Sequence, residues 1–341
     1  MKVSQKEFGK TKEGQLVTET TLENSKGWSV KVINLGGIIT EINVPDRNGN
    51  IENVVLNFKS VEEYLNEDFH PYFGCLTGRV AGRMTAGKMT VEGKDYQLAI
   101  NDGPNHLHGG KKGFDKKFYE TVIKEGNESA SVTIKGVSED GDQGYPGTCA
   151  IAVTYTFNEI GELSLDYDVK TDKATPICLT NHSYFNLAAK GNVLDHTLQI
   201  FTDQYIPTDN DLTLLDRIEK VNENNTFVNE RRAGDAFPNL HLQHGDKYFF
   251  GAKTGDLRHC ATFKDEKSGR QLDTYSTETC MQFYTGYFLG DEPSNGFERH
   301  QALCLECQNY PNGVNAPEIE DIIFTPERPY NQKTVYRFST L

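Results

Sequence analysis

The sequence lacks any uncharged hydrophobic run long enough to cross a lipid bilayer, and residues 1–20 contain no apolar segment of signal-peptide length. Basic residues are also few, since 35 lysines and arginines stand against 49 acidic residues, for a net charge of −14. This charge opposes nonspecific binding to nucleic acid and to anionic membrane surfaces. We therefore expect a soluble protein that has neither nucleic acid nor a membrane as a partner.

The chain also lacks a disulfide framework. Its seven cysteines are an odd number and are scattered through apolar stretches. Cys304 and Cys307 have the spacing of half a zinc knuckle, but on a strand their thiols point to opposite faces, and no second pair is spaced to match. Reduced, buried thiols in a cytoplasmic protein fit this pattern best.

Helix signals are scarce and strand signals are abundant. A capping box formed by Ser60 and Glu63 predicts a short helix over 61–67. The β-branched stretch 29–45 is interrupted by two glycines, and 89–97 has the pattern of a hairpin. Further strands are predicted at 53–58, 132–134, 150–157, 163–169, 177–187, 197–201, 282–289, 303–308 and 334–338. Without repeats or linkers, the sequence predicts one large all-β domain over 1–341, with long loops at 138–148 and 208–246.

The stretch 303–312 is the first candidate for chemistry. Leu303, Leu305 and Cys307 fall on one face of a strand and form a core face, whereas Glu306 falls on the other face, between Cys304 and Gln308. A carboxylate on a buried strand is costly unless it is paired or used. The alternative is an edge strand whose polar face lies in water.

Two other segments combine histidine with polar or small neighbours. His106 and His108 precede two glycines, an arrangement that fits two metal ligands, one imidazole in a cleft, or a solvated loop. No third ligand at helical spacing follows, so a metal site is disfavoured. In the predicted strand 177–187, His182, Tyr184 and Asn186 share one face and indicate a polar cleft.

Arginines at 79 and 83 lie in a turn that is bracketed by glycines. The guanidinium group is a forked donor suited to paired oxygens in a carboxylate, a phosphate or vicinal hydroxyls. The alternative is a basic surface loop.

With these motifs in view, the chain resembles the aldose 1-epimerases, or galactose mutarotases. The resemblance rests on the segments NLGGIITEINVPDRNG, YFGCLTGRVAGR, NDGPNHLHGG, DGDQGYPG, TNHSYFNL, QFYTGYFL and CLECQNYPNGVNAP, in that order, and on the closing YRF. It implies a large antiparallel β-sandwich of the galactose mutarotase type, with a sugar cleft across one sheet. It also implies that no metal or other cofactor takes part.

The resemblance further implies roles for individual residues. Glu306 would be the general base and His182 the general acid. The residues that would bind or line the sugar are Arg83, His108, Asp246, Gln282, Tyr184 and Tyr284. The chain departs from the family at Gly82, in the run 226–240 and after Asp246, where Asp-Lys-Tyr-Phe replaces the usual Asp-His-Asn-Phe.

The implied reaction interconverts the α and β anomers of free aldohexoses such as galactose and glucose. A carboxylate takes the proton of the C1 hydroxyl while an imidazolium protonates the ring oxygen. One alternative is a non-catalytic sugar-binding module on the same fold, and another is a glycosidase with two carboxylates. A phosphosugar 1-epimerase is the third, because Arg79, Arg83 and Lys247 could supply positive charge.

Overall fold

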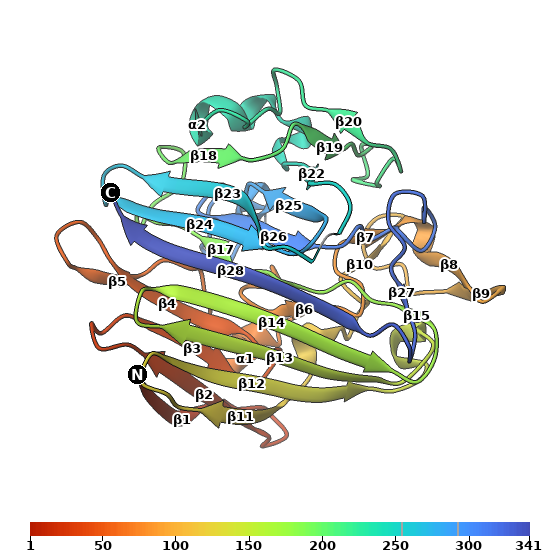
Figure 1. Ribbon diagram of the computed structural model, residues 1–341, viewed down its shortest axis with the longest axis horizontal. Coiled ribbons are helices and arrows are strands. Elements are labelled where there is room, and N and C mark those ends of the chain that lie inside the picture. The colour runs from red at the N-terminus through yellow and green to blue at the C-terminus, as the bar shows by residue number, and fades with distance from the viewer. Residues whose placement is uncertain (254, 292) are drawn as a thin grey trace.

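The computed structural model describes residues 1–253, 255–291 and 293–341, and its largest element is a nine-stranded antiparallel sheet. Figure 1 shows this sheet as a broad layer with the long C-terminal strand near its middle. In spatial order the strands are β11 (Glu120–Lys124), β12 (Ser129–Ser138), β13 (Cys149–Asn158), β14 (Glu162–Thr171), β28 (Tyr330–Thr340), β24 (Arg270–Ser276), β23 (Arg258–Asp265), β18 (Thr197–Ile200) and β21 (Arg231–Arg232).

Two further sheets and several short pairs complete the strands. The five-stranded sheet has the order β1 (Lys2–Lys10), β2 (Leu16–Glu23), β3 (Ser29–Ile33), β4 (Ile39–Pro45) and β5 (Ile51–Asn53). The six-stranded sheet has the order β17 (Tyr184–Phe185), β26 (Leu303–Gln308), β25 (Cys280–Tyr284), β22 (Lys247–Phe249), β19 (Gln204–Ile206) and β20 (Glu219–Lys220). The two-stranded pairs are β7 (Arg83–Met84) with β10 (His106–Leu107), β8 (Lys88–Val91) with β9 (Lys94–Gln97), β6 (Leu76–Thr77) with β16 (Thr180–Asn181), and β15 (Thr175–Pro176) with β27 (Ile323–Phe324).

Helices are few, as the sequence predicts. The described residues contain α1 (Val61–Tyr64) and α2 (Ala233–Ala236), together with short 3-10 turns. The capping box forms, because the Glu63 N–H donates to Ser60 Oγ at 3.3 Å and Ser60 Oγ donates to Glu63 Oε2 at 2.9 Å. The helix nevertheless ends at Tyr64, three residues earlier than predicted.

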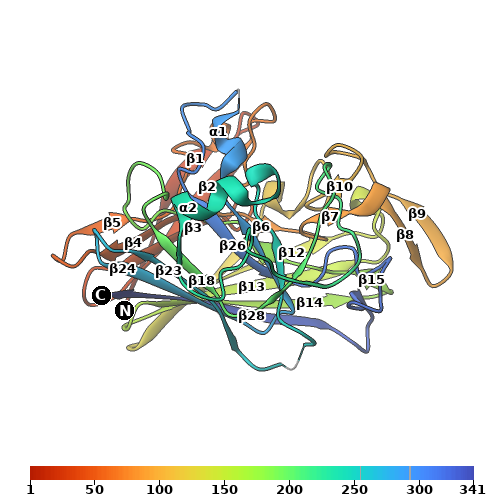
Figure 2. The same ribbon diagram turned by 90° about the horizontal axis from the view of Figure 1, so that it is seen from above.

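The hydrophobic core is shared by the three sheets. Strand β13 alternates buried and partly exposed residues along most of its length, which is the pattern of a sheet with one face against a core. Its inner side chains pack in one cluster with Val30 of β3 and Leu305 of β26. Seen from above in Figure 2, the nine-stranded sheet lies below the other strands, with α1 and α2 on the opposite side. This arrangement confirms the predicted all-β sandwich, and the single-domain organisation stays a prediction that the shared core supports.

Three of the predicted strands are wrong in detail. In the predicted strand 53–58, Asn53 ends β5, Val55 forms an isolated bridge, and the remaining residues are irregular. The segment 177–187 is not one strand but the two short strands β16 and β17, which pair with different partners, β6 and β26. The segment 282–289 leaves the sheet after Tyr284 and becomes a 3-10 turn over Tyr287–Gly290.

The cysteines agree with the sequence. All seven are described, and each is buried and free. Cys307 packs in the core shared by the sheets, whereas Cys304 lies in a second cluster on the other side of β26, so their side chains point to opposite faces as predicted. No helix among the described residues is both long and apolar enough to span a bilayer.

Arg79 has a structural role. Its side chain is 2% exposed, and its Nη1 donates to the carbonyls of Pro146 and Gly147 at 2.7 and 2.9 Å. Its Nη2 donates to Ser138 Oγ at 2.7 Å. The arginine therefore holds the loop 138–148 against the core and does not belong to a basic surface patch.

We expect Arg79→Met to destabilise the fold by at least about 3 kcal/mol, because several buried carbonyl and hydroxyl oxygens lose their donors. Urea unfolding followed by far-UV circular dichroism measures the change. Arg217→Met is the control, because the Arg217 side chain is 57% exposed and its ion pair with Glu219 lies at the surface. Equal midpoints for the two variants would contradict the structural role of Arg79.

Candidate active site

A cleft of about 360 Å³ lies over one face of the six-stranded sheet. Its floor consists of side chains from β17, β26, β25 and β22, and its walls are formed by loops around residues 68–72, 102–108, 208–214 and 288–291 and by Pro293. The lining combines charged, polar, aromatic and aliphatic side chains, among them Tyr72, Arg83, Asp102, His108, His182, Tyr184, Leu212, Leu214, His244, Lys247, Gln282, Tyr284, Phe288, Asp291, Glu306 and Gln308.

Strand pairing fixes the row of side chains that contains Glu306. Glu306 on β26 pairs directly with Gln282 on β25, and Gln282 pairs directly with Lys247 on β22. Residues that are opposite one another in an antiparallel ladder project from the same face. The alternation within β26 predicted from the sequence is confirmed, because Leu305 packs in the core while Glu306 and Gln308 line the cleft. Since β26 lies inside the sheet, the edge-strand alternative for Glu306 is wrong.

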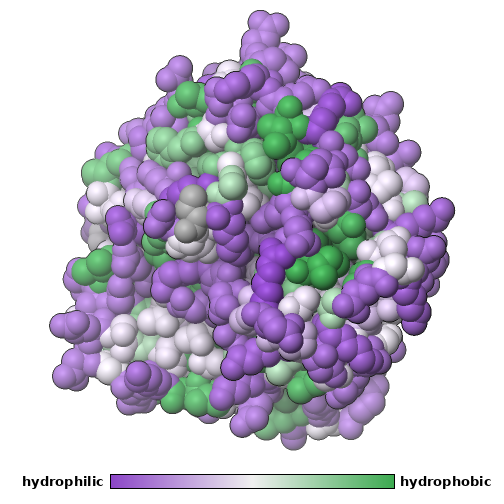
Figure 3. All heavy atoms as spheres, turned by 45° about the vertical axis from the view of Figure 1, so that its right-hand side comes forward, coloured by the Kyte–Doolittle hydropathy of each residue, from purple (hydrophilic) through white to green (hydrophobic). Residues whose placement is uncertain are grey.

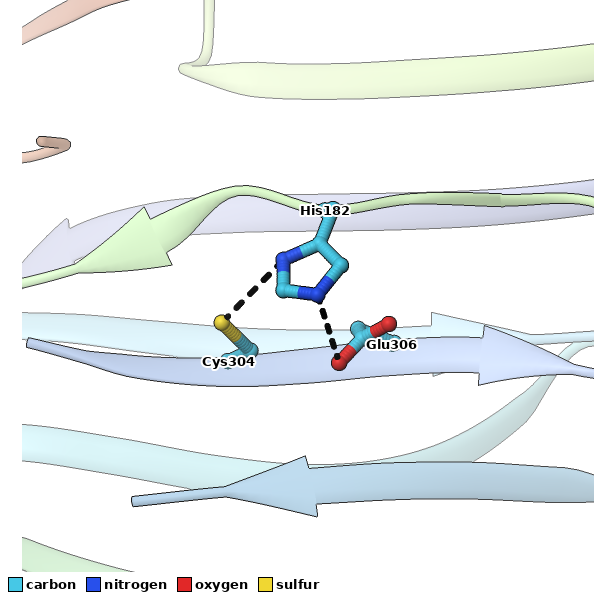
Figure 4. Close-up of side chains that lie close together, drawn as sticks. All are labelled: His182, Cys304 and Glu306. Carbon is cyan, nitrogen blue, oxygen red and sulfur yellow. Dashed lines mark hydrogen bonds and ion pairs between the residues drawn. The ribbon is translucent and has the colours of Figure 1, made fainter. Parts of the chain in front are cut away.

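Glu306 faces His182 across the floor of the cleft. His182 Nε2 lies 3.6 Å from Glu306 Oε1, and the two residues are 5% and 2% exposed. On the other side of the imidazole, Nδ1 lies 3.6 Å from Cys304 Sγ. Figure 4 shows the imidazole above β26, between the thiol and the carboxyl group. The carboxyl and the imidazole therefore present two polar groups side by side to whatever occupies the cleft.

Burial shifts the two groups in opposite directions. Removal from water raises the pKa of Glu306 to about 8, against a smaller opposing effect of Lys247 and Arg83. The same cause lowers the pKa of His182 to about 3. Both shifts disfavour the charged form of the group. Between about pH 3 and about pH 8 the cleft therefore holds a neutral carboxyl beside a neutral imidazole, and the pair carries one titratable proton.

Cys304 lies against the second ring nitrogen of His182. Burial raises the pKa of the Cys304 thiol well above its usual value, so the sulfur keeps its proton. A neutral thiol sulfur can accept a weak hydrogen bond from Nδ1–H, which leaves Nε2 of the neutral imidazole without a proton. The nitrogen that faces the protonated carboxyl of Glu306 can then accept its proton.

Arg83 and His108 lie on the adjacent pair β7–β10 and its following turn. Arg83 Nε donates to Asp102 Oδ2 at 2.6 Å, which fixes the guanidinium at the cleft wall. His108 has a φ of 52° and its Nδ1 accepts the Gly82 N–H at 3.1 Å. Because burial lowers the pKa of His108 well below its usual value, the neutral ring carries its proton on Nε2 and can donate it to a ligand.

Aromatic rings surround the acid–base pair. The Tyr184 ring stacks on His182 with centroids 5.0 Å apart, and the Tyr72 ring lies 4.6 Å from that of His108. Tyr284 contacts Tyr184 at 5.9 Å and His244 at 4.7 Å. These rings exclude water from the floor and offer flat apolar surfaces of the kind that suit the C–H face of a sugar.

The structure brings seven of the eight predicted site residues to this cleft and leaves out Asp246. The Asp246 side chain lines a separate pocket together with Tyr205, Asn225 and His241. The physical reason is strand alternation, since the pairing of Lys247 with Gln282 turns Lys247 toward the cleft and its neighbour Asp246 away. Burial in this other environment raises the pKa of Asp246 to about 6.

Two further expectations from the sequence need correction. His106 does not share a site with His108, because its Nδ1 and Nε2 contact the Ala99 carbonyl and the Tyr145 hydroxyl, each at 2.7 Å. Asn186 does not join His182 on the cleft face, because its amide donates to backbone carbonyls, including that of Gln301 at 2.7 Å. Both residues are structural.

Several cleft residues are absent from the predicted set, namely Tyr72, Asp102, His244 and Lys247. Asp102 and His244 lie in loops whose course the hydrophobic pattern does not determine. Tyr72 has a φ of 61°, a backbone conformation that is uncommon for a bulky residue and that the sequence therefore does not predict. The sequence shows Lys247 as a departure from the family motif. It does not place the side chain in the cleft, because its orientation depends on the register of β22 against β25.

His182, Cys304 and Glu306 bring a nitrogen, a sulfur and an oxygen within 4.8 Å of one another. These donor types suit zinc, but metal ligation requires a thiolate and a carboxylate. Burial raises the pKa of Cys304 and of Glu306, so it opposes both ionisations. The donor set therefore fits a proton-transfer site better than a metal site, and the absence of a metal requirement stays a prediction.

We expect Glu306→Gln to change how stability depends on pH. The folded pKa of about 8 exceeds the unfolded value of 4.5, so stability linked to this proton is complete below pH 4.5 and is lost as pH rises to about 8. Relative to the variant, wild-type protein should lose about 1.4 kcal/mol of unfolding free energy per pH unit across this interval. Urea titrations at several pH values measure the difference, and parallel curves would show that Glu306 is ionised in the folded protein.

Comparison with known proteins agrees with this fold. The family described as Aldose 1-epimerase matches residues 18–337. The chain is 38% identical to galactose mutarotase of Sus scrofa, over 99% of this chain and 98% of that protein. It is 32% identical to aldose 1-epimerase of Escherichia coli K12, over 96% of both. A solved galactose 1-epimerase from Lactobacillus acidophilus superposes with a TM-score of 0.87 at 25% identity, over 99% of both chains. The protein belongs to the aldose 1-epimerase family.

Proposed function

We propose that this protein interconverts the α and β anomers of free aldoses, such as galactose and glucose, with Glu306 as general base and His182 as general acid. The observation that carries this proposal is the contact between His182 Nε2 and Glu306 Oε1 at 3.6 Å, at the floor of a cleft. The reaction exchanges protons at two oxygens that are bonded to the same carbon. An acid and a base so close together suit that pair of oxygens.

The steps follow from the protonation of the pair. The buried carboxyl and imidazole share one proton, and binding of a polar sugar lets the proton pass to the imidazole and leave a carboxylate. Glu306 then takes the proton of the C1 hydroxyl, and His182 donates its Nε2 proton to the ring oxygen. The ring C–O bond breaks, the C1–C2 bond rotates, and closure on the other face of the aldehyde gives the second anomer.

The remaining cleft residues hold the sugar while C1 rotates. Arg83, His108 and Gln282 offer N–H donors to hydroxyl groups, whereas Tyr184 and Tyr284 cover apolar faces of the ring. Arg83 is anchored by Asp102 through Nε alone, so its Nη groups make no hydrogen bond within the described residues and can reach a hydroxyl. Asp246 is omitted from this set because its side chain lies in the other pocket.

A glycosidase is the weaker alternative. It needs two carboxyl groups flanking a bond, about 5 Å or more apart. Beside Glu306, the cleft-lining carboxylates Asp102 and Asp291 are paired with Arg83 and Arg299, at 2.6 Å each, and the third, Asp68, is exposed to water. The non-catalytic sugar-binding alternative gives no role to an acid–base contact between two buried side chains.

A cytosolic setting is part of the proposal, and the seven free cysteines support it.

We expect Glu306→Gln to lower the turnover of anomer interconversion by two to four orders of magnitude, the usual worth of a positioned base. The amide keeps the shape of the side chain and a hydrogen bond to a hydroxyl, so sugar affinity should change little. Polarimetry on freshly dissolved α-glucose and α-galactose measures the rate. Thermal unfolding of the same preparation measures the folded fraction.

Glu278→Gln is the matched control for that experiment. Glu278 is also fully buried and has a pKa raised to about 7 by burial, but it pairs with Lys253 at 2.9 Å outside the cleft. This variant should alter stability and leave turnover per folded molecule within about threefold of wild type. Near wild-type mutarotation by a folded Glu306→Gln protein would remove Glu306 from the mechanism.

We expect kcat/KM to stay level across neutral pH and to fall above pH 8 by about tenfold per unit. Above the pKa of Glu306 the pair has lost its shared proton, so His182 has none to donate. NMR saturation transfer between the two anomers at equilibrium gives the rate at each pH. A profile that instead rises between pH 7 and 9 would show that the rate-limiting proton transfer needs the fully deprotonated pair.

A further inference from the structure

Lys247 is a buried cation without a partner. Its side chain is 2% exposed and lines the cleft, and its Nζ makes no hydrogen bond with any described residue. A lysine is almost never buried in this way unless an acidic group accompanies it, because an unpaired ammonium loses its hydration. Burial lowers the pKa of Lys247 for this reason, and its ammonium group has no hydrogen-bonded counterpart among the residues that the structure describes.

The neighbouring charges do not supply that counterpart. Asp102 is occupied by Arg83 at 2.6 Å, and Asp291 by Arg299 at 2.6 Å, while Asp68 is exposed to water. Glu306 is the buried carboxyl on the cleft floor and interacts electrostatically with Lys247, but Gln282 lies between their strands in the cross-strand row and the Lys247 Nζ makes no hydrogen bond to it. Burial also keeps the proton on Glu306 in the empty cleft, since its pKa is raised to about 8. Lys247 is thus the one buried cleft cation that lacks a carboxylate within contact distance among the described residues.

The row geometry places this cation at the far end of a sugar. Lys247 and Glu306 are separated by two strand spacings, about 9.5 Å between their backbones. One monosaccharide whose C1 lies at Glu306 and His182 extends along the row past Gln282 toward Lys247. The substituent of the sugar that is most remote from C1 then meets the ammonium group.

A neutral hydroxyl at that position would accept a hydrogen bond but leave the charge of Lys247 uncompensated. An acidic substituent removes that cost and forms a charge-assisted hydrogen bond. A single cation matches a single negative charge. Arg83 adds no second unbalanced cation, because its charge is balanced by Asp102. The chemistry favours a carboxylate over the doubly charged phosphate of a phosphosugar.

We propose that Lys247 selects aldoses that carry an anionic group at the end remote from C1, and that the preferred substrates are hexuronic acids. This inference rests on the proposed anomer interconversion and adds a substrate class to it. Neutral aldoses remain substrates, because the acid–base pair acts at C1 and does not involve the remote substituent.

The test compares galacturonate, galactose and galactose 6-phosphate as substrates of the full-length protein. NMR saturation transfer at equilibrium measures enzyme-catalysed anomer exchange for each sugar after subtraction of the spontaneous rate. We expect wild-type kcat/KM to be highest for galacturonate. Lys247→Gln should lower the ratio of kcat/KM for galacturonate to kcat/KM for galactose by about 10- to 100-fold, because any effect on the acid–base pair acts on both sugars alike.

Lys135→Gln is the matched control, because Lys135 is exposed on β12 and loses the same charge far from the cleft floor. It should leave the ratio of the rates for galacturonate and galactose unchanged. If Lys247→Gln does not fold, the ratio of the wild-type rates for galacturonate and galactose still tests the proposal. Galactose exchange without a preference for galacturonate would overturn the anionic class and leave the proposed function intact. A Lys247-dependent preference for galactose 6-phosphate would overturn the carboxylate, and no exchange of any sugar would instead overturn the proposed function.

Discussion

The chemistry of this protein depends on keeping a carboxyl group and an imidazole out of water at the centre of a sheet. Glu306 and His182 are almost fully buried, and desolvation moves their pKa values to about 8 and about 3. In water the carboxyl group would titrate near pH 4 and the imidazole near pH 6.5, so only the imidazole would change charge near neutrality. Burial instead gives a neutral pair that carries one proton across the physiological range. An acid and a base that share one proton are ready for either direction of a reversible proton exchange.

The rest of the structure serves that burial in two distinct ways. Strand pairing fixes which side chains reach the floor, because Glu306, Gln282 and Lys247 are opposite one another on three adjacent strands. Backbone hydrogen bonds set their spacing, so the floor does not depend on side-chain packing alone. The walls come from loops that carry Tyr72, Leu212 and Phe288. The outer surface seen in Figure 3 is mainly hydrophilic, with hydrophobic residues in small separate groups, so apolar material is concentrated inside.

The sequence determines the floor better than the walls, for a physical reason. Alternation in 303–308 has a period of two and a clear core face, so it assigns Glu306 to the cleft without knowledge of any partner. The segment around Asp246 gives no such contrast, because the charged pair Asp246 and Lys247 precedes aromatic residues and no alternation is visible. Their orientation follows from the register with β25, which is a long-range property. The break in 177–187 is also set from outside, since its two halves pair with β6 and β26.

Long-range and contact electrostatics act in opposite senses on this molecule. A net charge of −14 repels anions from the surface as a whole, but ionic screening limits that field to about 8 Å at physiological salt. Inside the cleft, the ammonium of Lys247 acts in an environment of lower dielectric, where one contact outweighs many screened surface charges. In the proposed binding of an acidic sugar, the overall charge reduces the rate of arrival, whereas the buried cation lengthens the stay. On this proposal, substrate choice depends on a few desolvated groups on adjacent strands, which can change without any change of fold.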